Sequence, residues 1–286
     1  FKKNNIKFDL YKTSQYVTEK ELLKIIHNYD GIICGDDEIS KKVIDKAKNL
    51  KVISKWGTGI DSIDKEYALK KSIKVFNSPG AFTKAVGQHA VGLMFSVTRN
   101  ITFNHIDILN NNWSKRICDT IENKNIGIIG YGKIGKEIKK ILKIFKPKFY
   151  INDVKRIGLP KTPLKKLLSK SDIVFISCDL NESSKYLIRL KELKIMKKSS
   201  ILINVSRGPI IKNDDLIKAL KKKIISFAAL DVYENEPFKK NSKFLKLKNC
   251  IFTSHNAFNS KQLIDNINSR SVKNLIKYFK SYKKIV

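Results

Sequence analysis

The sequence contains few acidic residues, few arginines and no long apolar run. Its 286 residues hold 58 Lys and Arg against 26 Asp and Glu, and six of the basic residues are Arg. No apolar stretch approaches the roughly 18 residues that a membrane-spanning helix needs, which argues against a membrane protein. A hydrophobic content of 42% is nevertheless sufficient for the buried core of one or two domains.

Cysteine is sparse and lacks the CxxC spacing that is typical of metal or redox sites. We therefore interpret Cys34, Cys118, Cys178 and Cys250 as free thiols in a reducing cytoplasm, and we expect no metal site. The chain begins at Phe1 without Met, and no signal-peptide-like apolar segment follows. We expect a cytoplasmic protein whose natural start lies before this residue.

The net charge of +32 is the most unusual property of the composition. Such a charge is typical of proteins that bind nucleic acid or an anionic surface. The lysines, however, are spread along the whole chain, and Asn and Ile are abundant as well. Because these three residue types share A/T-rich codons, genome composition explains the charge, and we expect no nucleic-acid partner. The charge should still attract anionic substrates and cofactors.

A glycine-rich turn is the most informative motif. A short apolar run from Asn125 to Ile129 predicts a buried strand, and it leads into Gly130-x-Gly132-x-x-Gly135 and an amphipathic helix. In this strand–turn–helix context the glycines allow a tight turn and close approach of a pyrophosphate, which the helix N-terminus, here Lys133 and Ile134, would bind. A second strand ends at Asp153, where a carboxylate is suited to the adenosine ribose hydroxyls of NAD.

Strands and helices alternate along the chain. In the N-terminal part we predict strands at 6–11, 29–34, 51–54 and 74–77, and a helix that begins with the capping box Thr18-Glu19-Lys20-Glu21. After the glycine-rich turn, the predicted strands are 125–129, 148–152, 172–177, 200–205, 225–230 and 250–254. This alternation predicts an α/β fold with a doubly wound parallel sheet.

Residues 82–110 show an apolar repeat of three to four and predict one long helix, either buried or at a subunit interface. Gln88 and His89 lie on it, and we assign them core or surface roles rather than a place in a cleft. A last helix is predicted from Lys261 to Tyr282.

Polar residues gather just after the last three strands, at the sheet edge where ligands bind. Arg207 follows one strand, Asp231, Glu234 and Glu236 follow the next, and His255 follows the last. Such a set suits hydride transfer at a hydroxyl-bearing carbon. His would act as the proton acceptor or donor, a carboxylate would orient it, and Arg would hold a substrate carboxylate. The pattern itself does not choose between the two glutamates.

These motifs together resemble the D-isomer-specific 2-hydroxyacid dehydrogenases, particularly the phosphoglycerate dehydrogenase branch, over essentially the whole chain. The segments that carry the resemblance are 51–61 (KVISKWGTGID), 77–81 (NSPGA), 130–135 (GYGKIG), 203–208 (INVSRG), 229–237 (ALDVYENEP) and 254–256 (SHN). The resemblance implies an NAD-dependent oxidoreductase that interconverts a D-2-hydroxy acid and a 2-oxo acid.

The resemblance also implies roles for single residues. Arg207 would bind the substrate carboxylate and carbonyl, His255 would be the acid/base, and Glu236, selected by its Glu-Pro pairing, would orient His255. Asp231 matches the residue that holds the nicotinamide amide. Lys55 and the backbone amides of Trp56, Gly57 and Thr58 would contact substrate.

The family architecture implies two domains. We expect a Rossmann NAD-binding domain at 79–259 and a smaller flavodoxin-like α/β substrate domain made of 1–78 with 260–286, whose first strand should precede Phe1. The helix at 80–110 would form a homodimer interface. Two departures stand out: Ser177-Cys178-Asp179 replaces the His-x-Pro that is frequent near the adenine pocket, and Asn256-Ala257 replaces a small pair after the histidine.

The preferences for substrate and cofactor depend on single residues rather than on the motifs as a whole. Because Lys55 could meet a phosphate, 3-phosphoglycerate is the first expectation, while lactate, glycerate and sugar-derived acids stay open. Asp153 favours NAD over NADP by repelling the extra phosphate. A non-catalytic, NAD-responsive binding protein on the same fold is the alternative from another functional class.

Overall fold

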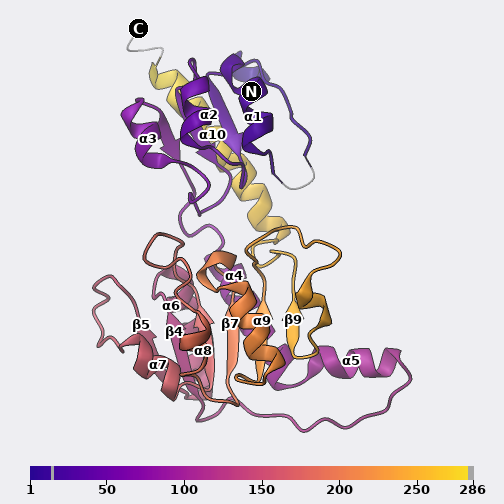
Figure 1. Cartoon of the computed structure of the whole chain (residues 1–286). Helices are drawn as coiled ribbons and strands as arrows, with labels where there is room; N and C mark the ends of the chain where they lie inside the picture. Colours follow the sequence, from indigo (N-terminus) through magenta and orange to yellow (C-terminus); the bar gives the residue numbers. More distant parts are fainter. Residues whose placement is uncertain (14–15, 283–286) are drawn as a thin grey trace. The chain divides into compact units, whose positions relative to one another are not determined.

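The computed structural model describes residues 1–13 and 16–282. Its internal contacts divide the chain into two compact units, which Figure 1 shows coloured along the sequence. The first unit comprises Phe1–Phe82 and the segment from Asn259 onward, and the second comprises Thr83–Phe258. The expected domain boundaries were at residues 78/79 and 259/260.

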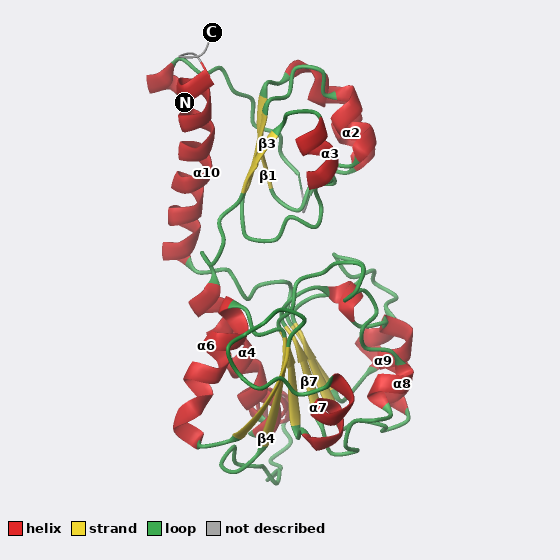
Figure 2. Cartoon of the chain, turned by 90° about the vertical axis from the view of Figure 1, so that its left-hand side faces the viewer, coloured by secondary structure: helices red, strands yellow, loops and turns green. Residues whose placement is uncertain are grey.

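The first unit is a small parallel α/β structure. Among its described residues, β1 (Gly31–Cys34), β2 (Val52–Lys55) and β3 (Lys74–Phe76) form one sheet in that order. The helices α2 (Lys41–Lys46) and α3 (Lys65–Lys70) lie on one face, and α10 (Lys261–Tyr282) covers the other (Figure 2). Apolar side chains from both the strands and the helices form its core, among them Val43, Ile44 and Ile53.

The N-terminal segment differs from the sequence-based expectation. The alternating residues 6–11 form no strand, and a 3-10 turn, η1 (Lys2–Asn4), precedes them. Phe8, Leu10 and Tyr11 are exposed, and no described strand pairs with this segment. The alternating apolar residues therefore do not pack against a core, which is the packing that favours a strand. The helix α1 (Glu19–Ile25) does begin with the predicted Thr18/Glu21 capping box and continues into η2 (Ile26–Asn28).

The second unit is built on a six-stranded sheet of described residues in which all strands run parallel. Its order is β5-β4-β6-β7-β8-β9, with bounds β4 (Asn125–Ile129), β5 (Lys148–Asn152), β6 (Ile173–Ile176), β7 (Ile201–Asn204), β8 (Phe227–Leu230) and β9 (Cys250–Phe252). The chain moves from β4 to β5 on one side and then returns to β6 on the other. The order therefore reverses next to β4, and ligands of doubly wound sheets bind beyond the strand ends at such a point.

Helices cover both faces of this sheet, as the doubly wound topology requires (Figure 2). One layer contains α4 (Thr83–Thr98) and α6 (Lys133–Leu142), and the other contains α7 (Leu164–Lys170), α8 (Leu190–Leu193) and α9 (Asn213–Lys221). The central strands are buried on both sides, which explains their continuous apolar runs. Short 3-10 turns complete the unit: η3 (Lys143–Phe145), η4 (Gly208–Ile210) and η5 (Lys243–Lys246).

The single long helix predicted at 82–110 is wrong in one respect, because the structure contains two helices there. The helix α4 ends at Thr98, and α5 (Ile101–Leu109) starts after Asn100, whose backbone is left-handed at φ 53°. Asparagine tolerates this conformation better than most residues do, so it allows the chain to change direction. Most apolar residues of α4 are buried, whereas Ile101, Ile106, Ile108 and Leu109 of α5 are exposed.

Within the described residues, none of the helices combines the length and the apolar character that crossing a membrane requires. The longest one, α10, is amphipathic and places one side against β1 and β2. Ser54 Oγ donates to the backbone oxygen of Ser271 at 3.0 Å, and Trp56 Nε1 donates to Asn268 Oδ1 at 2.7 Å. These contacts attach the C-terminal helix to the end of β2.

Candidate active site

The glycine-rich turn has the geometry of a phosphate-binding loop. Gly130 follows β4 with φ 87°, and a Cβ there would lie 2.4 Å from the backbone nitrogen of Cys178. A Cβ on Gly135 would lie 2.3 Å from the oxygen of Gly130, so this glycine lets α6 approach its strand. Nothing lies within 4 Å of the Cβ position of Gly132, so there is space for a ligand beside the backbone directly before α6, which begins at Lys133 and Ile134.

Asp153 lies next to this loop. Its carboxylate oxygens accept hydrogen bonds from the backbone nitrogens of Tyr131 at 2.6 Å and Lys155 at 2.7 Å. The structure therefore brings together the carboxylate after β5 and the glycines after β4, as the sequence predicted for a dinucleotide site. The residues present fit a dinucleotide, with backbone N–H groups for its phosphates and an acidic group for its ribose hydroxyls.

Ser177 was not assigned a role by the sequence, yet it supports the same loop. Its buried hydroxyl donates to the backbone oxygen of Gly130 at 2.7 Å, across the reversal point of the sheet. The sequence did contain one indication of this role: Ser177 directly follows β6, at the place where the family often has His-x-Pro near the adenine pocket. The neighbouring Cys178 packs its backbone against Gly130, and burial raises the pKa of its thiol to about 12, so it stays protonated.

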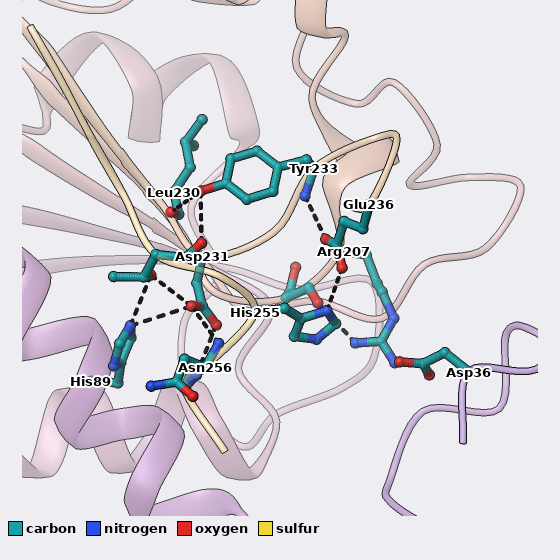
Figure 3. Close-up of polar contacts among 12 residues, drawn as sticks. Asp36, His89, Arg207, Leu230, Asp231, Tyr233, Glu236, His255 and Asn256 are labelled. Carbon is teal, nitrogen blue, oxygen red and sulfur yellow. Dashed lines mark hydrogen bonds and ion pairs between the residues drawn. The ribbon is translucent and has the colours of Figure 1, made fainter. Parts of the chain in front are cut away.

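The histidine after β9 is bonded to a carboxylate from the loop after β8. His255 Nδ1 lies 2.7 Å from Glu236 Oε2, and Glu236 Oε1 accepts from the backbone nitrogen of Tyr233 at 2.7 Å (Figure 3). An ionised carboxylate at Nδ1 requires a hydrogen on that nitrogen, which leaves Nε2 to exchange a proton with a substrate. This pair has the arrangement of a catalytic acid/base and the residue that orients it.

The structure also separates the two glutamates that the sequence pattern could not separate. Glu234 Oε1 accepts from the backbone nitrogen of Asn213 at 2.7 Å, at the start of α9. That contact stabilises a helix N-terminus. Glu236 contacts His255, as its Glu-Pro pairing implied.

Arg207 follows β7 on a turn that backbone contacts shape. Buried Asn204 donates through Nδ2 to the Arg207 oxygen at 3.0 Å and accepts from the Ser206 nitrogen at 3.1 Å. A Cβ on Gly208 would lie 1.8 Å from the carbonyl carbon of Tyr233. This close approach places the arginine turn directly against the loop that carries Glu236. The Arg207 guanidinium donates to the Ser206 oxygen at 2.9 Å, and its side chain is half-buried.

Asp231, directly after β8, is fully buried, and its carboxylate accepts hydrogen bonds from other residues of the second unit. Its carboxylate accepts from Thr253 Oγ1 at 2.6 Å and from the backbone nitrogens of Asn256 at 2.8 Å and Ala257 at 3.0 Å. Burial by itself would raise the pKa of this carboxyl, but these donors, with His89, outweigh burial and hold the pKa below its ordinary value. Thr253 and His89 had no site role in the sequence-based prediction.

The residues expected to bind substrate lie at the end of β2, in the first unit. The backbone nitrogen of Trp56 donates to the Cys34 oxygen at 2.7 Å, Gly57 has φ 130°, and Thr58 Oγ1 donates to the Ser78 oxygen at 3.0 Å. Lys55 is 2% exposed, and its ammonium contacts the Gly35 oxygen and, at 2.6 Å, the carboxylate of Asp36. Its charge is thus balanced within its own unit.

Among residues 1–13 and 16–282, no cluster of three or more His, Cys, Asp or Glu side chains is arranged to hold a metal ion. The groups that the structure does gather in the second unit are a glycine-rich turn suited to phosphates, a carboxylate beside that turn and a histidine–carboxylate pair. Such a set of groups is typical of a dinucleotide-dependent oxidoreductase.

Comparison with known proteins identifies the family. The model of the D-isomer specific 2-hydroxyacid dehydrogenase, NAD binding domain, matches residues 91–257. A glyoxylate reductase of Thermofilum pendens is 36% identical over 278 residues, which cover 92% of this chain and 82% of that protein. A D-3-phosphoglycerate dehydrogenase of Methanocaldococcus jannaschii is 33% identical over 250 residues, covering 84% of this chain and 48% of that protein.

Solved structures agree with this assignment. A crystal structure of a protein from Thermus thermophilus superposes with a TM-score of 0.85 at 26% identity, and the match covers 92% of this chain and 87% of that one. The chain therefore belongs to the D-isomer specific 2-hydroxyacid dehydrogenase family, and it is an NAD-dependent oxidoreductase. The predictions of family, fold class, enzyme class and cofactor are confirmed.

Proposed function

We propose that this protein reduces a small, unphosphorylated 2-oxo acid to the 2-hydroxy acid with NADH, giving the D isomer where carbon 2 becomes a stereocentre, and that glyoxylate and hydroxypyruvate are its best substrates. The observation that carries the proposal is the 2.7 Å contact between His255 Nδ1 and Glu236 Oε2, in a chain that belongs to this dehydrogenase family. Names of similar proteins support the substrate class, since glyoxylate reductases and a hydroxypyruvate reductase are among them.

The residues divide the reaction between them. NADH, when bound, supplies the hydride that reduces the carbonyl carbon of the 2-oxo acid. His255 donates a proton from Nε2 to the carbonyl oxygen, and Glu236 stabilises the charged imidazole before that transfer. Arg207 binds the substrate carboxylate through a planar fork and polarises the carbonyl. Two electrons and two hydrogens are thereby added across the C=O bond.

Cofactor contacts follow from the loop geometry. We assign the pyrophosphate to the backbone of Gly130, Gly132 and Gly135 with the first turn of α6 at Lys133 and Ile134. Asp153 would hold the ribose hydroxyls and disfavour the extra phosphate of NADP. Asp231 would accept from the nicotinamide amide in addition to its present donors.

The substrate preference depends on Lys55. This lysine was the reason to expect 3-phosphoglycerate, but its ammonium is buried and paired with Asp36. A substrate phosphate would have to displace that carboxylate from a desolvated partner, which is unfavourable. The backbone amides of Gly57 and Thr58 would instead contact a small carboxylate substrate, whereas the amide of Trp56 already donates to the Cys34 oxygen. We therefore rank unphosphorylated 2-oxo acids above 3-phosphoglycerate and phosphohydroxypyruvate.

The decisive experiment is a turnover panel of glyoxylate, hydroxypyruvate, pyruvate and phosphohydroxypyruvate, each with NADH and with NADPH. We expect kcat/KM for hydroxypyruvate to exceed that for phosphohydroxypyruvate by at least about tenfold, a difference of about 1.4 kcal/mol. The reverse order would restore the phosphoglycerate assignment. NADH binding without reduction of any member of the panel would make the protein a non-catalytic, NAD-responsive binder.

We propose further that the protein is a homodimer and that α5 forms the interface. The sequence assigned the interface to the whole 80–110 segment, but the apolar residues of α4 are already mostly buried within its own unit. The segment from α5 onward instead exposes a series of large apolar side chains: Ile101, Ile106, Ile108, Leu109, Trp113 and Ile117. Exposed apolar groups in such number are typical of a protein–protein contact.

A cytoplasmic location is our proposal as well. Cys34, Cys118, Cys178 and Cys250 are all free thiols, as expected in a reducing compartment. Cell fractionation of the tagged full-length protein tests this proposal, and recovery in an oxidising compartment would contradict it.

A further inference from the structure

The turn that carries His255 is attached to a single residue by three consecutive backbone amides. The nitrogen of His255 donates to the main-chain oxygen of Asp231 at 2.8 Å, and the nitrogens of Asn256 and Ala257 donate to its carboxylate at 2.8 and 3.0 Å. His255 itself has a left-handed backbone, at φ 52°. A β-carbon-bearing residue in this conformation needs its surroundings to hold it there, and the bonds to Asp231 supply that restraint.

A second chain of contacts reaches the same carboxylate from α4. His89 Nε2 lies 3.1 Å from Thr253 Oγ1 and 3.4 Å from Asp231 Oδ1, and Thr253 Oγ1 donates to Asp231 Oδ1 at 2.6 Å (Figure 3). A threonine hydroxyl has one hydrogen, which the contact with the carboxylate uses. The contact between His89 and the hydroxyl oxygen is therefore a hydrogen bond only if Nε2 carries the hydrogen. The network thus sets the tautomer of His89, whose Nε2–H group donates to Thr253 Oγ1 and lies 3.4 Å from Asp231 Oδ1.

This arrangement matters because Asp231 is buried. A carboxylate at 0% exposure remains ionised only when donors compensate for the loss of water. Burial raises the pKa of Asp231, and the contact with His89 is the largest of the contributions that lower that pKa again. The His89 side chain is itself only 23% exposed, so the contact is protected from competing water. Without this donor, Asp231 would gain a proton more easily and hold the two amides less firmly.

We propose that His89 is a positioning residue for catalysis, which acts through Thr253 and Asp231 to hold the His255 turn in its reactive conformation. The proposal rests on the catalytic role of His255 given above. All the contacts lie within the second unit, on α4, after β8 and after β9. His89 is not assigned any contact with substrate or cofactor.

Few other titratable groups lie on the three elements that surround Asp231. Lys84 and His89 belong to α4, and Cys250 and His255 to β9 and the turn after it. The start of the loop after β8 adds Tyr233, Glu234 and Glu236, of which Glu234 accepts from the Asn213 nitrogen. Burial raises the pKa values of Tyr233 and Cys250, so both are neutral in the neutral pH range. Whether neutral or protonated, His89 can donate from Nε2, so the contact survives across that range.

The experiment compares His89→Leu, His89→Gln and the distant His27→Leu in the full-length protein. Leucine removes the donor at similar size, whereas the terminal amide of glutamine can donate from nearly the same place. For each variant we would measure kcat and KM for the preferred 2-oxo acid between about pH 5 and 8. The Kd for NADH by fluorescence and the Tm complete the comparison. We expect His89→Leu to lower kcat about tenfold while the Kd for NADH changes less than about threefold.

The pH profile separates positioning from a general packing defect. If the donor keeps Asp231 ionised, the acid-side decline of kcat in His89→Leu begins at a higher pH than in the wild type. His89→Gln should restore most of kcat and the wild-type profile, and His27→Leu should match the wild type throughout. A uniform loss of kcat at every pH without recovery in glutamine, or no loss at all, would overturn the proposal.

A second variant covers the possibility that His89→Leu does not fold. Thr253→Val removes the bridging hydroxyl and should produce the same shift of the acid-side decline. The double variant should be no worse than the more affected single one, because both changes break one chain of contacts. Full additivity would contradict the inference. Absence of turnover by the wild type on every 2-oxo acid would instead remove the proposed function, and this inference with it.

Discussion

Gly208 and Tyr233 approach so closely that a Cβ on the glycine would lie 1.8 Å from the carbonyl carbon of the tyrosine. The two residues belong to turns after neighbouring strands, β7 and β8, and the contact joins the turn of Arg207 to the loop of Glu236. A backbone-to-backbone contact of this kind cannot be relieved by a side-chain rotation. The position therefore requires glycine for spatial reasons, without any unusual φ.

Replacement of Gly208 by Ala should accordingly separate the two turns. We expect kcat/KM to fall by about 100-fold or more and the Tm to decrease, because overpacking of this kind costs about 1–3 kcal/mol. Gly92→Ala is the matched control, since nothing lies within 4 Å of its Cβ position and alanine favours the α4 helix by about 0.5–1 kcal/mol. Equal activities of the two variants, measured with thermal unfolding, would contradict the assignment.

The pair of neighbouring glutamates provides a test of the catalytic assignment. Glu236→Gln should reduce kcat by about 10²–10⁴-fold with little change in NADH binding, because an amide stabilises the charged His255 far less than a carboxylate does. Glu234→Gln should change kcat less than about threefold and instead lower stability by about 0.3–1 kcal/mol, since the amide oxygen can still accept from the Asn213 nitrogen but the negative charge at the start of α9 is lost. Steady-state kinetics and chemical unfolding of both variants distinguish the two roles. A larger kinetic defect in Glu234→Gln would reverse the assignment.

Ser177 should act on cofactor affinity rather than on catalysis. Its hydroxyl donates to the Gly130 oxygen, so Ser177→Ala should raise the Kd for NADH about three- to tenfold, corresponding to one hydrogen bond of about 1 kcal/mol. Ser171→Ala is the control, because its buried hydroxyl donates to the Leu167 oxygen at 2.7 Å, away from the loop. Both variants should lose similar stability, and only the first should lose affinity in a fluorescence titration. An unchanged Kd in Ser177→Ala would remove this residue from the cofactor site.

Asp172 should make stability depend on pH. Burial by itself would raise the pKa of its carboxyl, but Lys197 at 2.6 Å and two donors from Asn125 outweigh burial and lower that pKa. A carboxylate with a lowered folded-state pKa contributes stability above its unfolded pKa of about 3.9, and the contribution disappears as pH falls through the folded value.

Asp172→Asn should therefore be less stable than the wild type near pH 7, and the difference should shrink as the pH falls below about 4. Urea unfolding at several pH values measures it. Because the ion pair is partly exposed, a moderate salt concentration should also reduce the difference. A deficit that stays constant from about pH 7 to about pH 3 would show that packing, rather than charge, accounts for the role of this residue.

The dimer proposal is tested by placing a charge on α5. Leu109→Glu, at a side chain that is 68% exposed, should shift the protein toward monomer in analytical ultracentrifugation if α5 forms the interface. Leu69→Glu, at a 74% exposed leucine on α3, should leave the assembly state unchanged. A wild-type protein that sediments as a monomer at micromolar concentration would end this proposal.

The strands and the order of the polar residues could be predicted from sequence because they depend on local patterns. Apolar runs such as Ile173 to Ile176 predict buried strands, and Gly130, Gly132 and Gly135 predict a phosphate-binding turn. The rule that ligands bind at the carboxyl ends of parallel strands then selected Arg207, His255 and a group of carboxylates from a chain rich in charge. The choice of Glu236 among those carboxylates came from the resemblance to the family, through its Glu-Pro pairing. Two predictions were wrong. The alternating residues 6–11 form no strand because no described strand pairs with them, and the helix predicted at 82–110 is interrupted at Asn100, where the chain changes direction.

The tertiary structure decided what depends on contacts between distant segments. Spacing along the chain cannot show that Glu234 caps α9 while Glu236 bonds His255. The two glutamates lie two residues apart on an irregular loop, where spacing does not determine the direction in which each side chain points. Nor can composition show that Lys55 is buried against Asp36, or that His89 reaches Thr253 across 164 positions of sequence. Local propensity determines which elements form, whereas hydrogen-bond partners are selected only when packing brings the elements together.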